Sequence, residues 1–145
     1  MLAVLGGGAA VLLSFVVLDW YRYPTSGANR IDAVTFRGLA ANDDVAGMPA
    51  IVSIYFDWLA WVLLIAVVAI AAAATIASRA VGALRTSGLL LGAVGTVATY
   101  WAVQEATSSG DEGGYAFQSA SSGLWFALCG FLLAGIGAAI GPRRI

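Results

Sequence analysis

Four long runs of apolar residues, none of them broken by a charged side chain, constrain this chain more than any other feature. They lie at residues 1–18, 58–77, 88–103 and 123–140. A helix needs about 20 consecutive apolar residues to cross a bilayer, and bilayers tolerate the glycines within the third run. The composition agrees, since 61% of residues are hydrophobic and only 10% are charged, against roughly 45–50% and about 25% in soluble domains. We therefore predict an all-α membrane protein, folded as a four-transmembrane-helix bundle that forms a single integral membrane domain over residues 1–145.

The first run could instead be a cleaved signal peptide, and the second span could begin at more than one residue. The first run has neither a basic amino-terminal segment nor a clear small-residue cleavage site before Asp19, so a span is favoured over a cleaved signal peptide. The second apolar stretch extends back to Ile51 but contains Asp57. Because a carboxylate at the bilayer centre costs about 2.5–3.5 kcal/mol, the cheaper register places Asp57 at the interface. Residues 51–56 then form an interfacial lead-in to the span at 58–77.

Three polar segments connect the runs. We expect two outer loops, residues 19–57 and 104–122, and one inner hairpin, residues 79–87. The polar part of the first loop, about 30 residues between the first and second helices, mixes Gly, Pro, Ser, Asn and Asp. Within it, residues 31–39 fit a helical period through Ile31, Val34 and Leu39 and a strand period through Val34 and Phe36. Both conformations therefore remain open for this segment.

Arginine and aromatic residues indicate the orientation. The other three arginines and all eight acidic residues lie on the side of the predicted membrane opposite to Arg79, Arg85, Arg143 and Arg144. Since arginine in short loops is retained in the cytoplasm, we expect these four residues to be cytoplasmic anchors of a multi-pass plasma (inner) membrane protein with both termini in the cytoplasm. Aromatic residues form a belt near the outer ends of the runs: Trp20, Tyr21, Tyr23, Tyr55, Trp58, Trp61, Tyr100, Trp101, Tyr115 and Trp125.

Small residues at four-residue spacing predict where the helices touch. Lipid tails are as apolar as leucine, so membrane helices associate through close backbone contact. We expect an intrachain bundle in preference to a homodimer, although the chain has enough of these rows for both. The rows are Gly88, Gly92 and Thr96; Gly130, Ala134 and Ala138; Gly137 and Gly141; and Ala66, Ala69, Ala73 and Ala77.

Several kinds of chemistry lack their usual residues. The chain has no histidine and a single cysteine, Cys129, so we expect no disulfide, no metal site and no cofactor. A net charge of −1 gives no basic surface for nucleic acid. Without histidine, the bases available to a nucleophile are carboxylates at the outer interface. We therefore expect a protein that is not an enzyme.

Asp57 is the first functional candidate, because an acid near membrane depth is a functional hypothesis by default. The competing interpretation is an interface anchor, since Asp19-Trp20 and Asp57-Trp58 repeat one pattern at two span ends. Asp57 is also expected to pair with an arginine of the first loop: Arg22, Arg30 or Arg37. Glu105 and Asp19 are the other two candidate acids. The acidic groups at 42–44 and 111–112 lack calcium-loop spacing and fit solvated loops better than a cation site.

Two functional hypotheses remain. The favoured one is an accessory or assembly subunit, whose partners are the lipid bilayer and a larger membrane protein complex, bound through small-residue helix faces and the outer loop. The alternative is a small homo-oligomeric channel or transporter. It would hold Asp57 and Glu105 at its outer mouth and Thr96 and Thr99 along the path.

Overall fold

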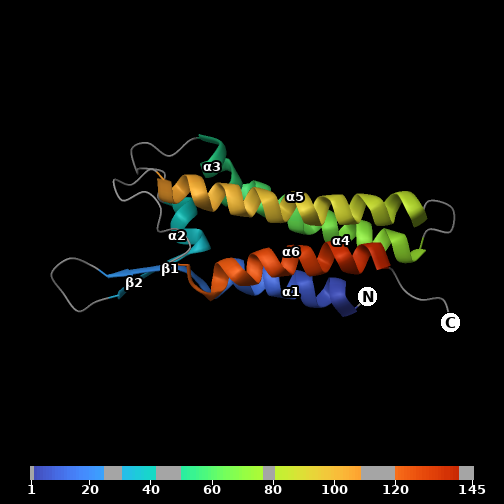
Figure 1. The fold of residues 1–145 in the computed structure, drawn as a ribbon, viewed down its shortest axis with the longest axis horizontal. Helices are drawn as coiled ribbons and strands as arrows, with labels where there is room; N and C mark the ends of the chain where they lie inside the picture. Colours follow the sequence, from blue (N-terminus) through green and yellow to red (C-terminus); the bar gives the residue numbers. More distant parts are fainter. Residues whose placement is uncertain (1, 25–30, 42–49, 77–80, 109–119, 141–145) are drawn as a thin grey trace.

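The computed structural model describes residues 2–24, 31–41, 50–76, 81–108 and 120–140 (Figure 1). The chain is nearly all helical. Its elements, in order, are α1 (Leu2–Val16), β1 (Asp19–Pro24), β2 (Ile31–Thr35), α2 (Phe36–Ala41), α3 (Ala50–Ile54), a π-helical turn η1 (Tyr55–Leu59), α4 (Ala60–Ile76), α5 (Val81–Ser108) and α6 (Ser122–Ile140).

Three helical stretches in the described part of the chain are long and apolar enough to cross a membrane. They are Ala50–Ala74, Val81–Glu105 and Ser122–Ile140. Helix α1 is equally apolar but has only 15 residues, which gives a length of about 22 Å at 1.5 Å per residue. Three such helices indicate a transmembrane protein and insertion into a membrane.

The prediction of an all-α chain is wrong in one respect, because β1 and β2 form a two-stranded antiparallel sheet. The register pairs Arg22 with Ala33 and Pro24 with Ile31, with an irregularity between Asp19 and Tyr21. The segment at 31–39, open between helix and strand, adopts both in succession. It changes at Thr35, whose Oγ1 accepts a hydrogen bond from the N–H of Gly38 at 3.2 Å and so caps α2.

Two of the helices are longer than the expected spans, whereas α1 ends at Val16, two residues before the expected end of the first span. Residues 81–87, expected in the hairpin, form the first turns of α5, which continues to Ser108. Residues 50–57, expected in the outer loop, are helical in α3 and η1 and continue directly into α4. Polar residues at the end of a membrane helix can keep its backbone hydrogen bonds while their side chains reach water, so the apolar run understates the helix.

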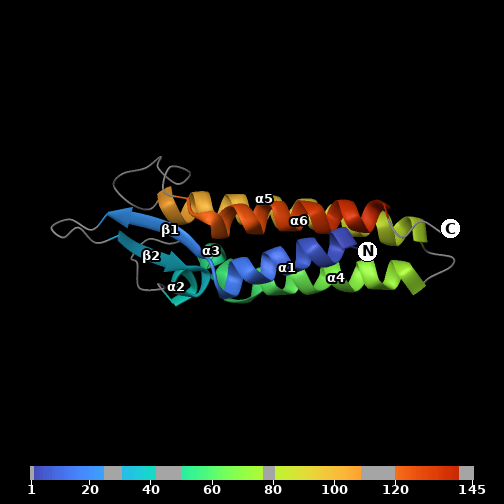
Figure 2. The ribbon, with the colours of Figure 1, turned by 90° about the horizontal axis from the view of Figure 1, so that it is seen from below.

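The four long helices lie side by side and alternate in direction (Figures 1 and 2). Helix α6 packs along both α1 and α5, and α4 packs along α5. The sheet and α2 lie at the end of the molecule where α1 ends and α4 begins, which we call the sheet end (Figure 2). Among the long helices, α1 contacts α6 along its length and α4 less extensively.

Glycines bring α6 into direct backbone contact with its neighbours. A Cβ added to Gly7 of α1 would lie 2.6 Å from both Ala134 N and Gly130 O. On the other side of α6, a Cβ on Gly92 of α5 would lie 2.6 Å from Gly135 Cα. Real Cβ atoms do not approach backbone this closely, so both seams depend on glycine.

Large apolar side chains point outward from this core. The inner seams carry glycine and alanine, while Leu12, Ile65, Val97 and Leu133 are among the large side chains exposed on α1, α4, α5 and α6. Exposed apolar surface of this extent is unfavourable in water but is the ordinary arrangement of helices that face lipid.

Candidate functional site

Aromatic rings from five elements meet at the sheet end. Phe15 of α1 stacks on Phe36 of α2 with ring centroids 4.2 Å apart, and Phe36 meets Phe56 of η1 edge to face at 5.4 Å. Trp61 of α4 approaches Phe15 at 5.2 Å, and Trp20 of β1 approaches Phe36 at 5.1 Å. We call these five residues the aromatic cluster. Its offset and edge contacts fix α2 and η1 against the end of α1.

Trp20 joins this cluster to the helices through hydrogen bonds. Its Nε1–H donates to the carbonyl oxygen of Ser14 at 2.9 Å, and the hydroxyl of Ser14 donates to Gly123 O at 2.7 Å. The Trp20 carbonyl accepts from the N–H of Ser121 at 2.9 Å. Each polar group of this buried corner is thus satisfied, and β1 is tied to both α1 and α6.

A second buried polar contact joins η1 to α5. The hydroxyls of Tyr55 and Thr99 are hydrogen-bonded to each other, and Thr99 Oγ1 also donates to Gly95 O at 2.7 Å. Because a threonine hydroxyl has one proton, Tyr55 is the donor in the shared bond. The Thr96 hydroxyl likewise donates within its own helix, to Gly92 O at 2.9 Å. The hydroxyls considered for a conducting path are therefore engaged by their own backbone.

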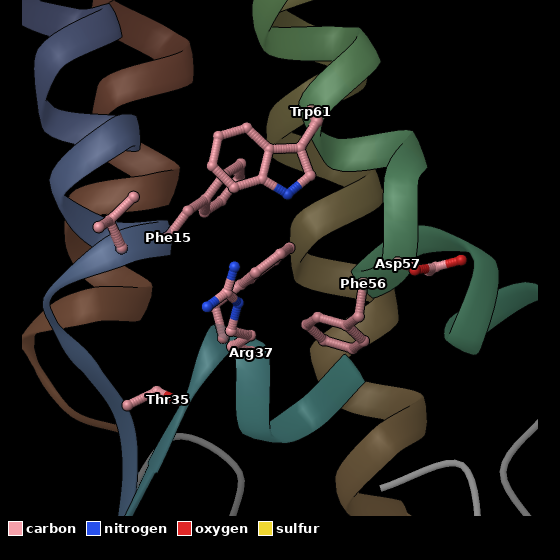
Figure 3. A pocket seen from close by; sticks show the side chains of 8 residues that line it. Phe15, Thr35, Arg37, Phe56, Asp57 and Trp61 are labelled. Atoms are coloured by element: carbon pink, nitrogen blue, oxygen red, sulfur yellow. The ribbon is translucent and has the colours of Figure 1, made fainter. Parts of the chain in front are cut away.

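A pocket of about 490 Å³ opens beside the aromatic cluster, between α1, α2, η1 and α4 (Figure 3). Its polar lining includes Arg37, Asp57 and Thr35. The Arg37 side chain extends toward Trp61 and Phe15, while the Asp57 carboxylate at the rim points away from Arg37 (Figure 3). Both charged side chains are exposed. The pocket therefore combines aromatic walls with one inward guanidinium.

The ion pair expected for Asp57 does not form with Arg22 or Arg37 in the part of the chain that the structure describes. Arg22 pairs instead with Asp19, Nη2 to Oδ2 at 3.0 Å. The π-helical turn, in which Ala60 N–H donates to Tyr55 O, turns Asp57 outward, and α2 turns Arg37 inward. Arg30 lies outside the described residues.

Asp57 and the other candidate acids lie apart in the fold. Asp19 is partly buried at the start of β1, Asp57 is exposed in η1, and Glu105 is half-buried near the end of α5. Among the described residues, no three of His, Cys, Asp and Glu gather in a way that could hold a metal ion. The acidic groups at 42–44 and 111–112 lie outside the described residues.

The expected aromatic belt divides in two. Trp20 is fully buried, because the first loop folds back and packs the Trp20 ring against Phe36 of α2 and Phe56 of η1. Trp61 is half-buried in the aromatic cluster. Trp58, Tyr100, Trp101 and Trp125 are exposed. Tyr55, also in the belt, is buried. The side chains of Tyr21 and Tyr23, and all of Tyr115, lie outside the described part.

The small-residue rows face different neighbours from one another. Gly88 and Gly92 of α5 meet α6 at Ala138 and Gly135, whereas Gly130 and Ala134 of α6 meet Gly7 of α1. Gly137 also faces α1, because a Cβ there would lie 2.8 Å from Val4 N.

The other predicted packing and anchor residues are partly or fully exposed, or lie outside the described part of the chain. Thr96 is half-buried, and Ala69 and Ala73 of α4 are exposed. Ala77, Arg79, Gly141, Arg143 and Arg144 lie outside the described residues; Arg85 is half-buried in α5.

Sequence reasoning missed the pocket and its arginine. Arg37 entered only as one of three partners for Asp57, and Gly7 was not among the predicted packing residues. A signal for Gly7 did exist, because Val4, Gly7, Val11 and Ser14 recur at helical spacing and form the buried face of α1. The pocket had no such signal, since it depends on how the first loop folds back.

A groove of about 540 Å³ lies between α1 and α4, farther from the sheet end than the pocket. Its side chains are apolar throughout, and four of them are small: Gly8, Ala9, Ala69 and Ala72. We call it the α1/α4 groove. It differs from the glycine seams because here the two helices leave open space between them.

No known protein-family model matches this chain, and neither a curated protein nor a solved structure is significantly similar to it.

Proposed function

We propose that this chain is a non-enzymatic, multi-pass protein of the plasma membrane that serves as an accessory or assembly subunit. In this proposal all four long helices cross the membrane, α1 included, the sheet end faces outward, and both termini are cytoplasmic. The arginine distribution supports that orientation. The first outer loop, folded in part as β1, β2 and α2, contributes a second surface for a partner.

The observation that carries the proposal is the small-residue row of α4. The rows of α5 and α6 are occupied by each other and by α1, but Ala69 and Ala73 are exposed and Ala66 is half-buried. Small side chains let a neighbouring backbone approach closely, so this face suits one membrane helix of a partner protein. The exposed faces of α5 and α6 carry Leu90, Val97 and Leu133, which suit lipid, as does Ile65 on another part of α4.

Site-specific photocrosslinking tests this proposal in the native membrane. A photoreactive residue at Ala73 should capture one partner protein in a constant ratio, and a second substitution, Ala66→Leu, should abolish that capture. The same residue at Ile136, an exposed position on α6, should capture lipid. Equal protein capture at both positions, or capture of a second copy of this chain alone, would reject the accessory-subunit proposal.

The homo-oligomeric channel is supported only by the exposed carboxylate of Asp57 and by Glu105. The bonds from Thr96 to Gly92 O and from Thr99 to Gly95 O weigh against it, because the two hydroxyls considered for the path are not turned toward one. Purified protein in liposomes decides the matter. Ion flux that falls in Asp57→Asn but not in Asp19→Asn would establish the channel and displace the subunit proposal.

A further inference from the structure

The pocket beside the aromatic cluster and the α1/α4 groove lie end to end. On α1, Leu12 lines the groove, and Phe15 and Val16, one turn later, line the pocket. On α4, Leu64 and Ile65 line the groove, and Trp61, one turn earlier, lines the pocket. The two hollows therefore follow one seam, polar at the sheet end and apolar along the helices.

The dimensions of the groove match one half of a bilayer. From Val4 to Leu12 it extends about 12 Å at 1.5 Å per residue. The hydrocarbon core of a bilayer is about 30 Å thick, so one leaflet is about 15 Å. Its lining has no polar side chain, and Gly8, Ala9 and Ala72 keep it open. Within a membrane, a hollow of this kind accommodates an acyl chain.

The polar end of the seam supplies a charge of defined sign. The guanidinium of Arg37 extends into the pocket (Figure 3) and has no ion-pair or hydrogen-bond partner among the described residues. Guanidinium groups bind phosphate in a bidentate geometry. Trp61 beside it is of the residue type that lies at headgroup level in membranes. Asp57 at the rim points away (Figure 3), which leaves Arg37 as the charge that faces a ligand.

We propose that the α1/α4 seam binds one phospholipid, with its phosphodiester on Arg37 and one acyl chain in the α1/α4 groove. The lipid belongs to the leaflet at the sheet end. This inference goes beyond the proposed function, because it needs no protein partner, although Ala69 of the α4 row also lines the groove. The carboxylate of Asp57 at the rim disfavours headgroups that carry a second negative charge.

Native mass spectrometry of the purified full-length protein tests the proposal. The protein, freed of lipid in a non-ionic detergent, is titrated with phosphatidylethanolamine, phosphatidylglycerol and diacylglycerol of the same acyl chains. We expect one equivalent of either phospholipid to bind and diacylglycerol to bind at least about tenfold more weakly, the effect of one charge-assisted contact. Inorganic phosphate alone should not bind, because the acyl chain supplies part of the affinity.

Two variants with matched controls assign the two ends of the seam. Arg37→Gln should weaken phospholipid binding at least about tenfold, whereas Arg22→Gln, at an exposed arginine paired with Asp19, should leave it unchanged. Ala9→Leu should fill the groove and weaken all three lipids, whereas Ala93→Leu, exposed on α5, should not. Phospholipid affinity unchanged in Arg37→Gln, or diacylglycerol bound as tightly as phospholipid, would overturn the headgroup assignment. Affinity unchanged in Ala9→Leu would overturn the groove assignment.

Discussion

Helix α1 packs closely on one neighbour at Gly7 and more loosely on another at the adjacent Gly8. At Gly7 the backbones of α1 and α6 touch, since an added Cβ would lie 2.6 Å from Gly130 O. At Gly8 the neighbour is α4, and an added Cβ would meet only Val68 Cγ2, at 3.3 Å. The difference lies in what stands opposite. Small residues face Gly7 and let the helices close, whereas the valine facing Gly8 holds α4 away and leaves the α1/α4 groove. The two adjacent glycines thus differ in whether backbone or a branched side chain stands opposite them.

Adding one methyl group at each glycine tests this contrast most strongly. Gly7→Ala forces a Cβ into the backbone of α6, so the helices must separate. We expect the free energy of unfolding in detergent to fall by about 2–3 kcal/mol, the usual cost of overpacking. Gly8→Ala is the matched control and should change it by less than about 1 kcal/mol, because a contact at 3.3 Å from Val68 Cγ2 requires only a small shift of one side chain. Equal losses in the two variants would refute the contrast.

Removing a buried hydroxyl should have an intermediate effect on the closed side. Ser14→Ala deletes the bond from Ser14 Oγ to Gly123 O that ties α1 to α6. Interhelical hydrogen bonds in membranes contribute about 0.6 kcal/mol on average and up to about 1.7 kcal/mol, and we expect a loss within that range in detergent unfolding. Thr86→Ala, at an exposed hydroxyl that bonds within α5, should be close to neutral. A neutral Ser14→Ala would show that the corner holding Trp20 does not contribute to α1/α6 packing.

Filling the open side should have the smallest effect on stability. Ala9 is exposed and lines the α1/α4 groove, so in Ala9→Leu the free energy of unfolding of lipid-free protein should stay within about 0.5 kcal/mol of the parent. The measurement is the same detergent unfolding series. A loss comparable to that of Gly7→Ala would mean that the groove is closed in solution.

Sequence reasoning located the three helical stretches that are long and apolar enough to cross a membrane, because charge-free apolar runs carry a direct physical meaning. It underestimated the length of two helices, because the polar residues at their ends were assigned to loops. These ends are Val81–Ser87 and Ala50–Asp57. It did not assign each small-residue row to a neighbouring helix, and α6 in fact turns Gly130 toward α1 and Gly135 toward α5.

The candidate site was less accessible to sequence reasoning. Asp57 drew attention as a charge near an apolar run, yet the pocket depends on Arg37, which α2 directs toward α4 (Figure 3). Nothing in the local pattern around Arg37 shows this, because the contact between Phe36 and Phe15 joins residues far apart in the chain. The burial of Trp20 has the same origin.

The account depends on α1 and α4 each crossing the membrane, and cysteine labelling of intact cells measures this directly. In a Cys129→Ser background, single cysteines are placed at Leu2, Arg22 and Gly82, all exposed, and treated with a membrane-impermeant maleimide. The account predicts labelling at position 22 in intact cells, and at positions 2 and 82 only after the membrane is permeabilised. Labelling of positions 2 and 22 from the same side would contradict it, because α1 would then not span the bilayer.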